Sequence, residues 1–253
     1  MYAVDWDTKT HLWEMETRGV RGLVFVDHHL ILASFTNELF LLDTERGTVI
    51  GKWEYPELSF LHKIYYDGEH IVIPSTGNDS VARIHPGTME LVDIVTLTGS
   101  PKDTLHFNSM GWDGEGNEYH LYHTPGKIVR RDTGETVFED LVGAHDLEFI
   151  DGLRVVVNDS SRRRTMLGDL RNKELTPIFT AEDGPSTTVS KWGWTRGAAY
   201  YPGMLFIGSA PANIHLLETT FFLEVGSMRL SDTAEESIFD ICLDPRDWQE
   251  ECE

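Results

Sequence analysis

The sequence has few cysteines, no long apolar run and few basic residues. Only two of its 253 residues are cysteine, Cys242 and Cys252, so it has neither a disulfide framework nor a CxxC motif. No apolar stretch approaches the roughly 20 residues that a membrane-spanning helix needs. The first seven residues have neither the cationic start nor the apolar stretch typical of a secretory signal. We therefore expect a cytoplasmic protein, in a reducing compartment, without membrane partners.

Basic residues are half as frequent as acidic ones. The 21 lysines and arginines stand against 42 aspartates and glutamates, and the formal net charge is −21. A negative field of this size repels a phosphate backbone, which argues against nucleic acid as a partner. Solubility alone explains such acidity, and the acidic segment 232–253 fits that explanation.

Motifs of the common catalytic folds are missing from the sequence. It contains no Walker loop, GxGxxG, GxSxG or HExxH motif, so a serine-triad hydrolase has no sequence support. Few segments show helical periodicity over about 11 residues or more, which disfavours a βαβ architecture. The chain has instead an imperfect internal repeat, which is the first feature to interpret because it organises the whole fold.

Five segments share one plan: a charged or imidazole residue, a short apolar strand, a turn, and a second apolar strand that ends at a small polar residue. The segments begin at Arg21, His62, His106, His145 and Arg196. In four of them the small polar residue follows after 13 residues, at Ser34, Ser75, Asn158 and Ser209. The third runs 17 residues to His123, because residues 113–117 form a loop insertion. The beginnings lie 41, 44, 39 and 51 residues apart, close to the roughly 40–50 residues of a four-stranded propeller blade.

We therefore predict an all-β fold, a five-bladed β-propeller with four-stranded antiparallel blades, as one domain over residues 1–253. The blades begin near residues 21, 62, 106, 145 and 196. Radial closure protects the exposed edges of a long series of hairpins. Segments 10–15 and 236–243 are the two candidates for the terminal strand that closes the ring. An open sandwich of two sheets is the alternative.

This repeat predicts a polar site at one mouth of the central channel, because the innermost strand of each blade runs along that channel. His62, His106 and His145 begin three consecutive blades. Neutral imidazoles that converge on one axis suit a divalent transition metal such as Zn, Mn or Fe. The alternative is a hydrogen-bonded ring of polar side chains around a water-filled channel, without a metal.

Other side chains are predicted at the same mouth. Arg21 and Arg196 begin the first and last blades, and their guanidinium groups suit the carboxylate or phosphate of a small anionic ligand. Asp146 and Glu148 are the candidates for a catalytic base. Alternatively, the arginines pair with rim carboxylates such as Asp103 or Asp159.

Three more residues complete the predicted substrate-binding set. Asn108 and Asp159 lie near the ends of strands that approach the mouth, and Asn108 or His123 is a further candidate metal ligand, base or orienting partner. Trp194 belongs to Trp-Gly-Trp at 192–194, where an exposed aromatic pair stacks on a flat ligand or, alternatively, wedges between blades. The arginine run 162–164 lies on the same rim or forms a solvated loop.

Several phrases of the sequence carry a family resemblance. They are His-Phe-Asn-Ser-Met at 106–110, Ala-His-Asp-Leu at 144–147, Arg-Gly-Ala-Ala at 196–199, Leu-Phe-Ile-Gly-Ser at 205–209 and Ile-Phe-Asp-Ile at 238–241. Over about residues 58–243 the chain resembles an uncharacterised bacterial family of five-bladed β-propellers, which implies the fold and the placement of polar residues but no activity. A looser similarity to gluconolactonase and strictosidine-synthase propellers implies channel calcium held by Glu, Asn and Asp, whereas His and Arg stand at the equivalent mouth here.

Two functions follow from the predicted site. The first is a metal-dependent enzyme, a hydrolase, lyase or isomerase, that acts on a small anionic substrate and holds its metal through the three histidines. The second is a non-catalytic propeller that binds a peptide, sugar or small anion in a polar, metal-free channel. A scaffold like the WD-repeat proteins ranks last, because the repeats lack the Gly-His and Trp-Asp signature of that class.

Overall fold

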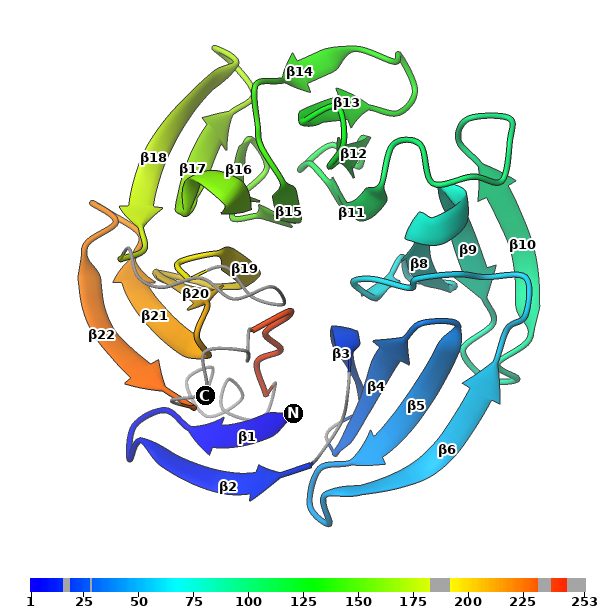
Figure 1. Ribbon diagram of the computed structural model, residues 1–253, viewed down its shortest axis with the longest axis horizontal. Helices are drawn as coiled ribbons and strands as arrows, with labels where there is room; N and C mark the ends of the chain where they lie inside the picture. Colours follow the sequence, from blue (N-terminus) through cyan, green and yellow to red (C-terminus); the bar gives the residue numbers. More distant parts are fainter. Residues whose placement is uncertain (16–18, 28, 183–191, 232–237, 245–253) are drawn as a thin grey trace. The chain divides into compact units, whose positions relative to one another are not determined.

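The structure is a computed structural model that describes residues 1–15, 19–27, 29–182, 192–231 and 238–244 (Figure 1). In these ranges the chain forms 22 β-strands and two short 3-10 turns, with no α-helix. Five antiparallel sheets have four strands each, and a sixth has two. The fold is a five-bladed β-propeller with four-stranded antiparallel blades, which confirms the predicted fold class. The chain divides into two compact units.

The first unit comprises Met1–Lys102 and Cys242–Glu253. It opens with a two-stranded hairpin, β1 (Tyr2–Asp5) and β2 (Thr10–Glu14). The first blade contains, in order, β3 (Val20–Asp27), β4 (Leu30–Phe35), β5 (Glu38–Asp43) and β6 (Thr48–Glu54). The second blade contains β7 (Tyr65–Tyr66), β8 (Ile71–Ser75), β9 (Ser80–Ile84) and β10 (Leu91–Thr96). Apolar side chains from both blades, such as Leu39 and Ile73, form one buried core between them.

The second unit, Asp103–Ile241, contains the other three blades. The third blade contains β11 (Phe107–Trp112), β12 (Glu118–Tyr122), β13 (Lys127–Arg130) and β14 (Thr136–Phe138). The fourth contains β15 (Ala144–Phe149), β16 (Arg154–Asp159), β17 (Arg164–Asp169) and β18 (Glu174–Thr180). The fifth contains β19 (Thr195–Tyr201), β20 (Met204–Ser209), β21 (Asn213–Glu218) and β22 (Glu224–Arg229).

The middle strands of the blades have apolar side chains on both faces. In β16 the run Val155, Val156 and Val157 is fully buried, with Val155 and Val157 in the core toward the third blade and Val156 in the core toward the fifth. A strand covered on both faces reads as a continuous apolar run rather than an alternating one. Each such valine contributes roughly 1.5–3 kcal/mol through burial. Packing between blades, rather than one central core, therefore holds this unit together.

The 13-residue spacing of the repeat reflects the register of the first hairpin in a blade, directly or within one residue. His145 pairs directly with Asn158, and Thr195, next to Arg196, pairs with Ser209. In the third blade the backbone N–H of His123 donates to the carbonyl of His106 at 3.3 Å. The small polar residue is also a link to the next blade, because the Ser34 hydroxyl donates to the carbonyl of His62 at 2.8 Å.

The segment predicted to be a closing strand at 236–243 is not a strand over its described part, residues 238–243. Ile238 and Phe239 pack on the fifth blade: a Cβ on Gly208 would lie 2.5 Å from Ile238, and the Phe239 ring centroid lies 4.7 Å from the guanidinium carbon of Arg196. Residues 236–237 lie outside the described ranges, and so does most of the acidic segment 232–253. The prediction of a single domain over residues 1–253, closed by a terminal strand, stays a prediction.

A search of the described residues for a membrane-crossing helix finds none with sufficient length and apolar character.

Candidate functional site

Four of the ten predicted site residues lie at β-bulges in the first strand of a blade. The pairing register shifts around Arg21 in β3, Asn108 in β11, Asp146 in β15 and the Arg196–Gly197 pair in β19. A bulge leaves its extra residue outside the ladder and turns the side chain in a new direction, and bulges are frequent beside active sites. These four residues lie in the first strands of the first, third, fourth and fifth blades, and nothing in the sequence indicated the bulges.

The first strands of the third, fourth and fifth blades are joined side by side (Figure 1). The backbone N–H of Leu147 in β15 donates to the Ser109 hydroxyl in β11 at 2.8 Å. The backbone N–H of Gly197 in β19 donates to Asp146 Oδ2 in β15, also at 2.8 Å. The second unit therefore brings the bulge residues of three consecutive blades into one neighbourhood, as the repeat predicts.

Three histidines stack in this neighbourhood. The ring centroids of His106 and His123 lie 4.8 Å apart, and those of His123 and His145 are also 4.8 Å apart. His145 is 6% exposed, whereas His123 is half-buried and the His106 side chain is 33% exposed. His123 is thus the middle ring of a stack that runs from solvent to the interior. It is the residue at the 17-residue spacing, so the shared repeat position is the signal that identifies it.

Each ring of the stack is oriented through Nδ1. His106 Nδ1 lies 2.9 Å from Asp103 Oδ2, and His123 Nδ1 lies 3.2 Å from the carbonyl oxygen of Ala144. His145 Nδ1 lies 2.8 Å from the carbonyl oxygen of Gly143. A carbonyl oxygen can only accept, so Nδ1 of His123 and of His145 carries a proton.

The environment keeps His123 neutral. Its pKa is lowered to about 4, mainly by burial and also by the nearby charges of His106 and Arg196, while the Ala144 carbonyl and Asp103 act in the opposite direction. The Arg196 guanidinium is therefore close enough to act on His123 electrostatically. Near neutral pH this corner of the second unit combines a permanent cation with an uncharged imidazole.

Aromatic rings hold the guanidinium of Arg196. Its central carbon lies 4.6 Å from the centroid of Trp194 and 4.7 Å from that of Phe239. Stacking uses the faces of the planar group, while its N–H donors point outward in the plane. Trp194 thus packs on the predicted anion-binding residue. Its role in stacking on a ligand stays a prediction.

Asp146, one of the two predicted bases, ties the fourth blade to the fifth. It is buried at positive φ (55°), and its Oδ2 accepts from Gly197 N–H at 2.8 Å and from the Asn158 amide at 3.2 Å. These bonds give Asp146 a positioning role for the bulge that carries Arg196. Glu148 is half-buried two residues further along β15, opposite Val156. Base catalysis by Asp146 or Glu148 stays a prediction.

Asp159, predicted to bind substrate, is the centre of a buried ion-pair network. It is 0% exposed, and Oδ1 accepts from the Val142 N–H at 2.7 Å. Oδ2 lies 2.9 Å from Arg164 Nε and 3.3 Å from Arg162 Nη1. Arg162 and Arg164, two arginines of the run 162–164, therefore pair with Asp159. Substrate binding by Asp159 stays a prediction.

His62 and Arg21 belong to the first unit and have partners there. His62 Nδ1 lies 3.0 Å from the carbonyl oxygen of Phe60 and 2.7 Å from the Thr76 hydroxyl. The Arg21 guanidinium lies 5.1 Å from the centroid of the Phe60 ring, and burial lowers its pKa. Arg21, like Arg196, is thus a bulge arginine packed on an aromatic ring.

The predicted metal site gains no support from side-chain geometry. Within the described ranges, no group of three or more His, Cys, Asp and Glu side chains could hold a metal ion. A metal centre formed by His62, His106 and His145 stays a prediction.

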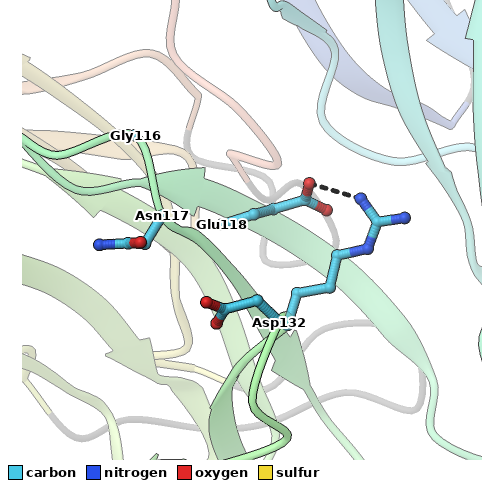
Figure 2. Close-up of a pocket in the computed structure, with 5 residues that line it drawn as sticks. Gly116, Asn117, Glu118 and Asp132 are labelled. Carbon is cyan, nitrogen blue, oxygen red and sulfur yellow. Dashed lines mark hydrogen bonds and ion pairs between the residues drawn. The ribbon is translucent and has the colours of Figure 1, made fainter.

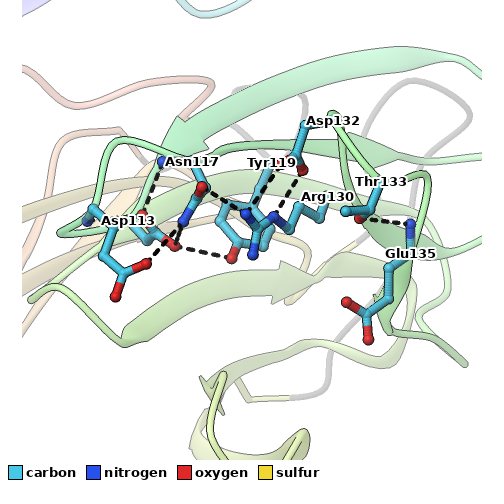
Figure 3. A network of polar contacts seen from close by, with 8 residues as sticks. Asp113, Asn117, Tyr119, Arg130, Asp132, Thr133 and Glu135 are labelled. Carbon is cyan, nitrogen blue, oxygen red and sulfur yellow. Dashed lines mark hydrogen bonds and ion pairs between the residues drawn. The ribbon is translucent and has the colours of Figure 1, made fainter.

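A separate cavity of about 350 Å³ lies beside the loop insertion of the third blade. Figure 2 shows the ion pair in its wall, where Glu118 and Arg131 are 2.7 Å apart. Figure 3 shows the adjoining network, in which Asp113 Oδ2 accepts from the Asn117 amide at 2.8 Å and from the Tyr119 hydroxyl at 3.0 Å. These polar groups satisfy one another, so the network stabilises the loop of residues 113–117.

Comparisons with known proteins establish the fold alone. No family model matches the sequence, and no curated protein matches it. Among solved structures, a chain in the crystal structure of a nidogen–laminin complex is similar, with a TM-score of 0.68 and 13% identity, over 88% of this chain and 84% of that one. A protein of unknown function from Bacteroides caccae is also similar, with a TM-score of 0.67 and 14% identity, over 95% of this chain and 93% of that one. Both likenesses support a β-propeller.

Proposed function

We propose that the protein binds a small anionic ligand at the Arg196 site, defined here as Arg196 with the stacked His106, His123 and His145. The observation that carries this proposal is the Arg196 guanidinium, which stands on a bulge between Trp194 and Phe239. The planar N–H groups of a guanidinium match the oxygens of a carboxylate or phosphate in bidentate geometry. The protein has a net charge of −21, so an arginine fixed in one position creates a local positive site that attracts an anion.

The observations favour a non-catalytic binding protein over a metal-dependent enzyme. Within the described residues no group of metal ligands is assembled, and Asp146, one of the two predicted bases, is bonded to Gly197 N–H. At the exposed end of the stack, Asp103 pairs with His106, and a histidine oriented by a carboxylate can serve as a general acid or base.

The second candidate is the metal-dependent enzyme, a hydrolase, lyase or isomerase using Zn, Mn or Fe. One observation favours it: the rings of His62 and His145 are both oriented by a backbone carbonyl at Nδ1, as is usual for histidines that bind metal through Nε2. Metal analysis of the purified protein separates the two candidates. Near-stoichiometric metal that is lost in His106→Ala and His145→Ala would favour the enzyme over the binding protein.

Titration with acetate and phosphate tests the proposal, with affinity measured by NMR or calorimetry. We expect Arg196→Ala to weaken binding of the preferred anion by roughly 10–150-fold, because hydrogen bonds to a charged group contribute about 1.5–3 kcal/mol. Arg196→Lys keeps the charge without the planar edge and should bind with intermediate affinity. Arg83→Ala, which removes one positive charge beside Asp93 in the second blade, is the matched control. Unchanged affinity in Arg196→Ala, or no binding of either anion to the wild type, would overturn the proposal.

Two finer predictions belong with this proposal. Kinship with the uncharacterised bacterial propeller family is proposed from the sequence phrases at residues 106–110 and 144–147. A cytoplasmic location is proposed from the composition, with its two cysteines.

A further inference from the structure

Two side chains of the third blade donate to the same carbonyl oxygen. Asn108 Nδ2 lies 3.1 Å from the oxygen of Ala144, and His123 Nδ1 lies 3.2 Å from it. Because a carbonyl oxygen only accepts, it determines both orientations: Nδ2 of Asn108 and the protonated Nδ1 of His123 face it. Oδ1 of Asn108 and Nε2 of His123 are therefore the groups turned to other partners, and both are acceptors.

These two acceptors need donors. Asn108 is 2% exposed, and its Oδ1 is a buried atom with no hydrogen-bond partner among the described residues. An orphaned buried acceptor of this kind costs free energy, which a donor supplied by a ligand, directly or through a water, recovers. His123 is half-buried and so is within reach of solvent. Because the neutral His123 imidazole has its proton on Nδ1, Nε2 is an acceptor, and His106, His145, Arg196 and Asp103 are the titratable and charged groups around it.

An acceptor pair beside a guanidinium selects among anions. A simple carboxylate has only acceptor atoms, so it gains nothing from a neutral imidazole lone pair and is repelled by it. An ammonium group would supply donors but would bring a positive charge toward Arg196. A hydroxyl supplies the donor without that charge.

We propose that the ligand of the Arg196 site is a hydroxycarboxylate, whose carboxylate binds Arg196 and whose hydroxyl donates to His123 Nε2, with Asn108 Oδ1 as the second acceptor. This inference rests on the proposed anion-binding function. It adds the chemical class of the ligand and gives His123 and Asn108 the role of determining specificity.

The test compares lactate with propionate, two carboxylates of similar size that differ by one hydroxyl, on the full chain by NMR titration. We expect lactate to bind wild type roughly 2–10-fold more tightly, as one net hydrogen bond allows. In His123→Phe, which keeps an aromatic ring in the stack, the lactate-to-propionate affinity ratio should fall to about one. Asn108→Leu, of similar size without an acceptor, should lower the ratio if His123→Phe does not fold. His29→Phe, at an exposed turn of the first blade, is the control.

The outcomes separate this inference from the function on which it rests. Equal affinities for lactate and propionate, both lost in Arg196→Ala, would overturn the hydroxycarboxylate class and leave anion binding standing. A ratio that persists in both His123→Phe and Asn108→Leu would overturn the assignment of these two residues. Failure of both carboxylates to bind wild type would overturn this inference together with the anion site.

Discussion

His62 in the second blade and His145 in the fourth are anchored by the same local structure. In each case Nδ1 faces a carbonyl two residues earlier and a hydroxyl of the 3-10 turn after the blade's second strand. Those hydroxyls are Thr76 Oγ1 at 2.7 Å and Ser160 Oγ at 3.1 Å. Both turns end at a residue in the left-handed conformation, Asp79 and Arg163. The repeat therefore reproduces the histidine anchor in detail.

The surroundings of the two anchors differ in charge. The residue before the turn is Ser75 in the second blade, and its hydroxyl accepts from the Ser59 N–H at 2.9 Å. In the fourth blade Asp159 occupies the same place, accepts from the Val142 N–H and adds Arg162 and Arg164. The fourth blade also borders the His123 stack and the Arg196 bulge. The same histidine anchor thus adjoins a neutral serine in the second blade and a charged aspartate–arginine network in the fourth.

The largest expected effect is at Asp159. Asp159→Ala removes the acceptor of the buried Val142 N–H and of two partly exposed arginines, and each hydrogen bond to a charged group contributes about 1.5–3 kcal/mol. Ser75→Ala in the second blade removes two neutral hydrogen bonds to the Ser59 backbone and should cost about 1–2 kcal/mol. Urea unfolding of both variants measures the difference. Equal losses of stability would contradict the view that the fourth blade depends on its charged network.

The two histidine anchors should be similar in strength. His62→Phe and His145→Phe each remove one Nδ1 donor from a carbonyl and a hydroxyl, and each should lower the unfolding free energy by about 1–3 kcal/mol. Thermal and urea unfolding give the two values. A large loss in one variant beside no loss in the other would break the equivalence of the second and fourth blades.

The smallest effect is a pH dependence confined to the His123 stack. Its folded pKa, about 4, lies below the ordinary value of 6.5, so between these values the unfolded chain binds a proton that the folded chain does not. The unfolding free energy should therefore fall as the pH falls from 6.5 to about 4, and above 6.5 the contribution vanishes.

Unfolding of wild type and His123→Phe at about pH 7 and pH 5 isolates this term from the carboxylates, which titrate in both proteins. The wild type should lose more stability than the variant on going to pH 5. Parallel losses in the two proteins would show that the His123 imidazole takes up its proton in the folded state as readily as in the unfolded chain.

Particular residues show how far sequence reasoning reached. The pairing of His145 with Asn158 could be predicted, because a fixed spacing around a turn is a hairpin register. The bulge at Asp146 could not, because it depends on a positive φ and on the Gly197 N–H 51 residues away. The alternating segment 236–243 resembles a strand, yet residues 238–243 form none, and Ile238 and Phe239 pack on Gly208 and Arg196, which no local pattern reveals. The stacking of Trp194 on Arg196 was also beyond local prediction.

Hairpin spacing and apolar runs are local properties, so the order of residues alone specified the five blades and the polar residues at their starts. The chemical state of those residues depends on neighbours that folding brings from other blades. The Ala144 carbonyl orients Asn108 and His123, and burial together with Arg196 keeps that imidazole uncharged. Hydrogen bonds and Coulomb forces act through space, so these features arise only once the blades have packed.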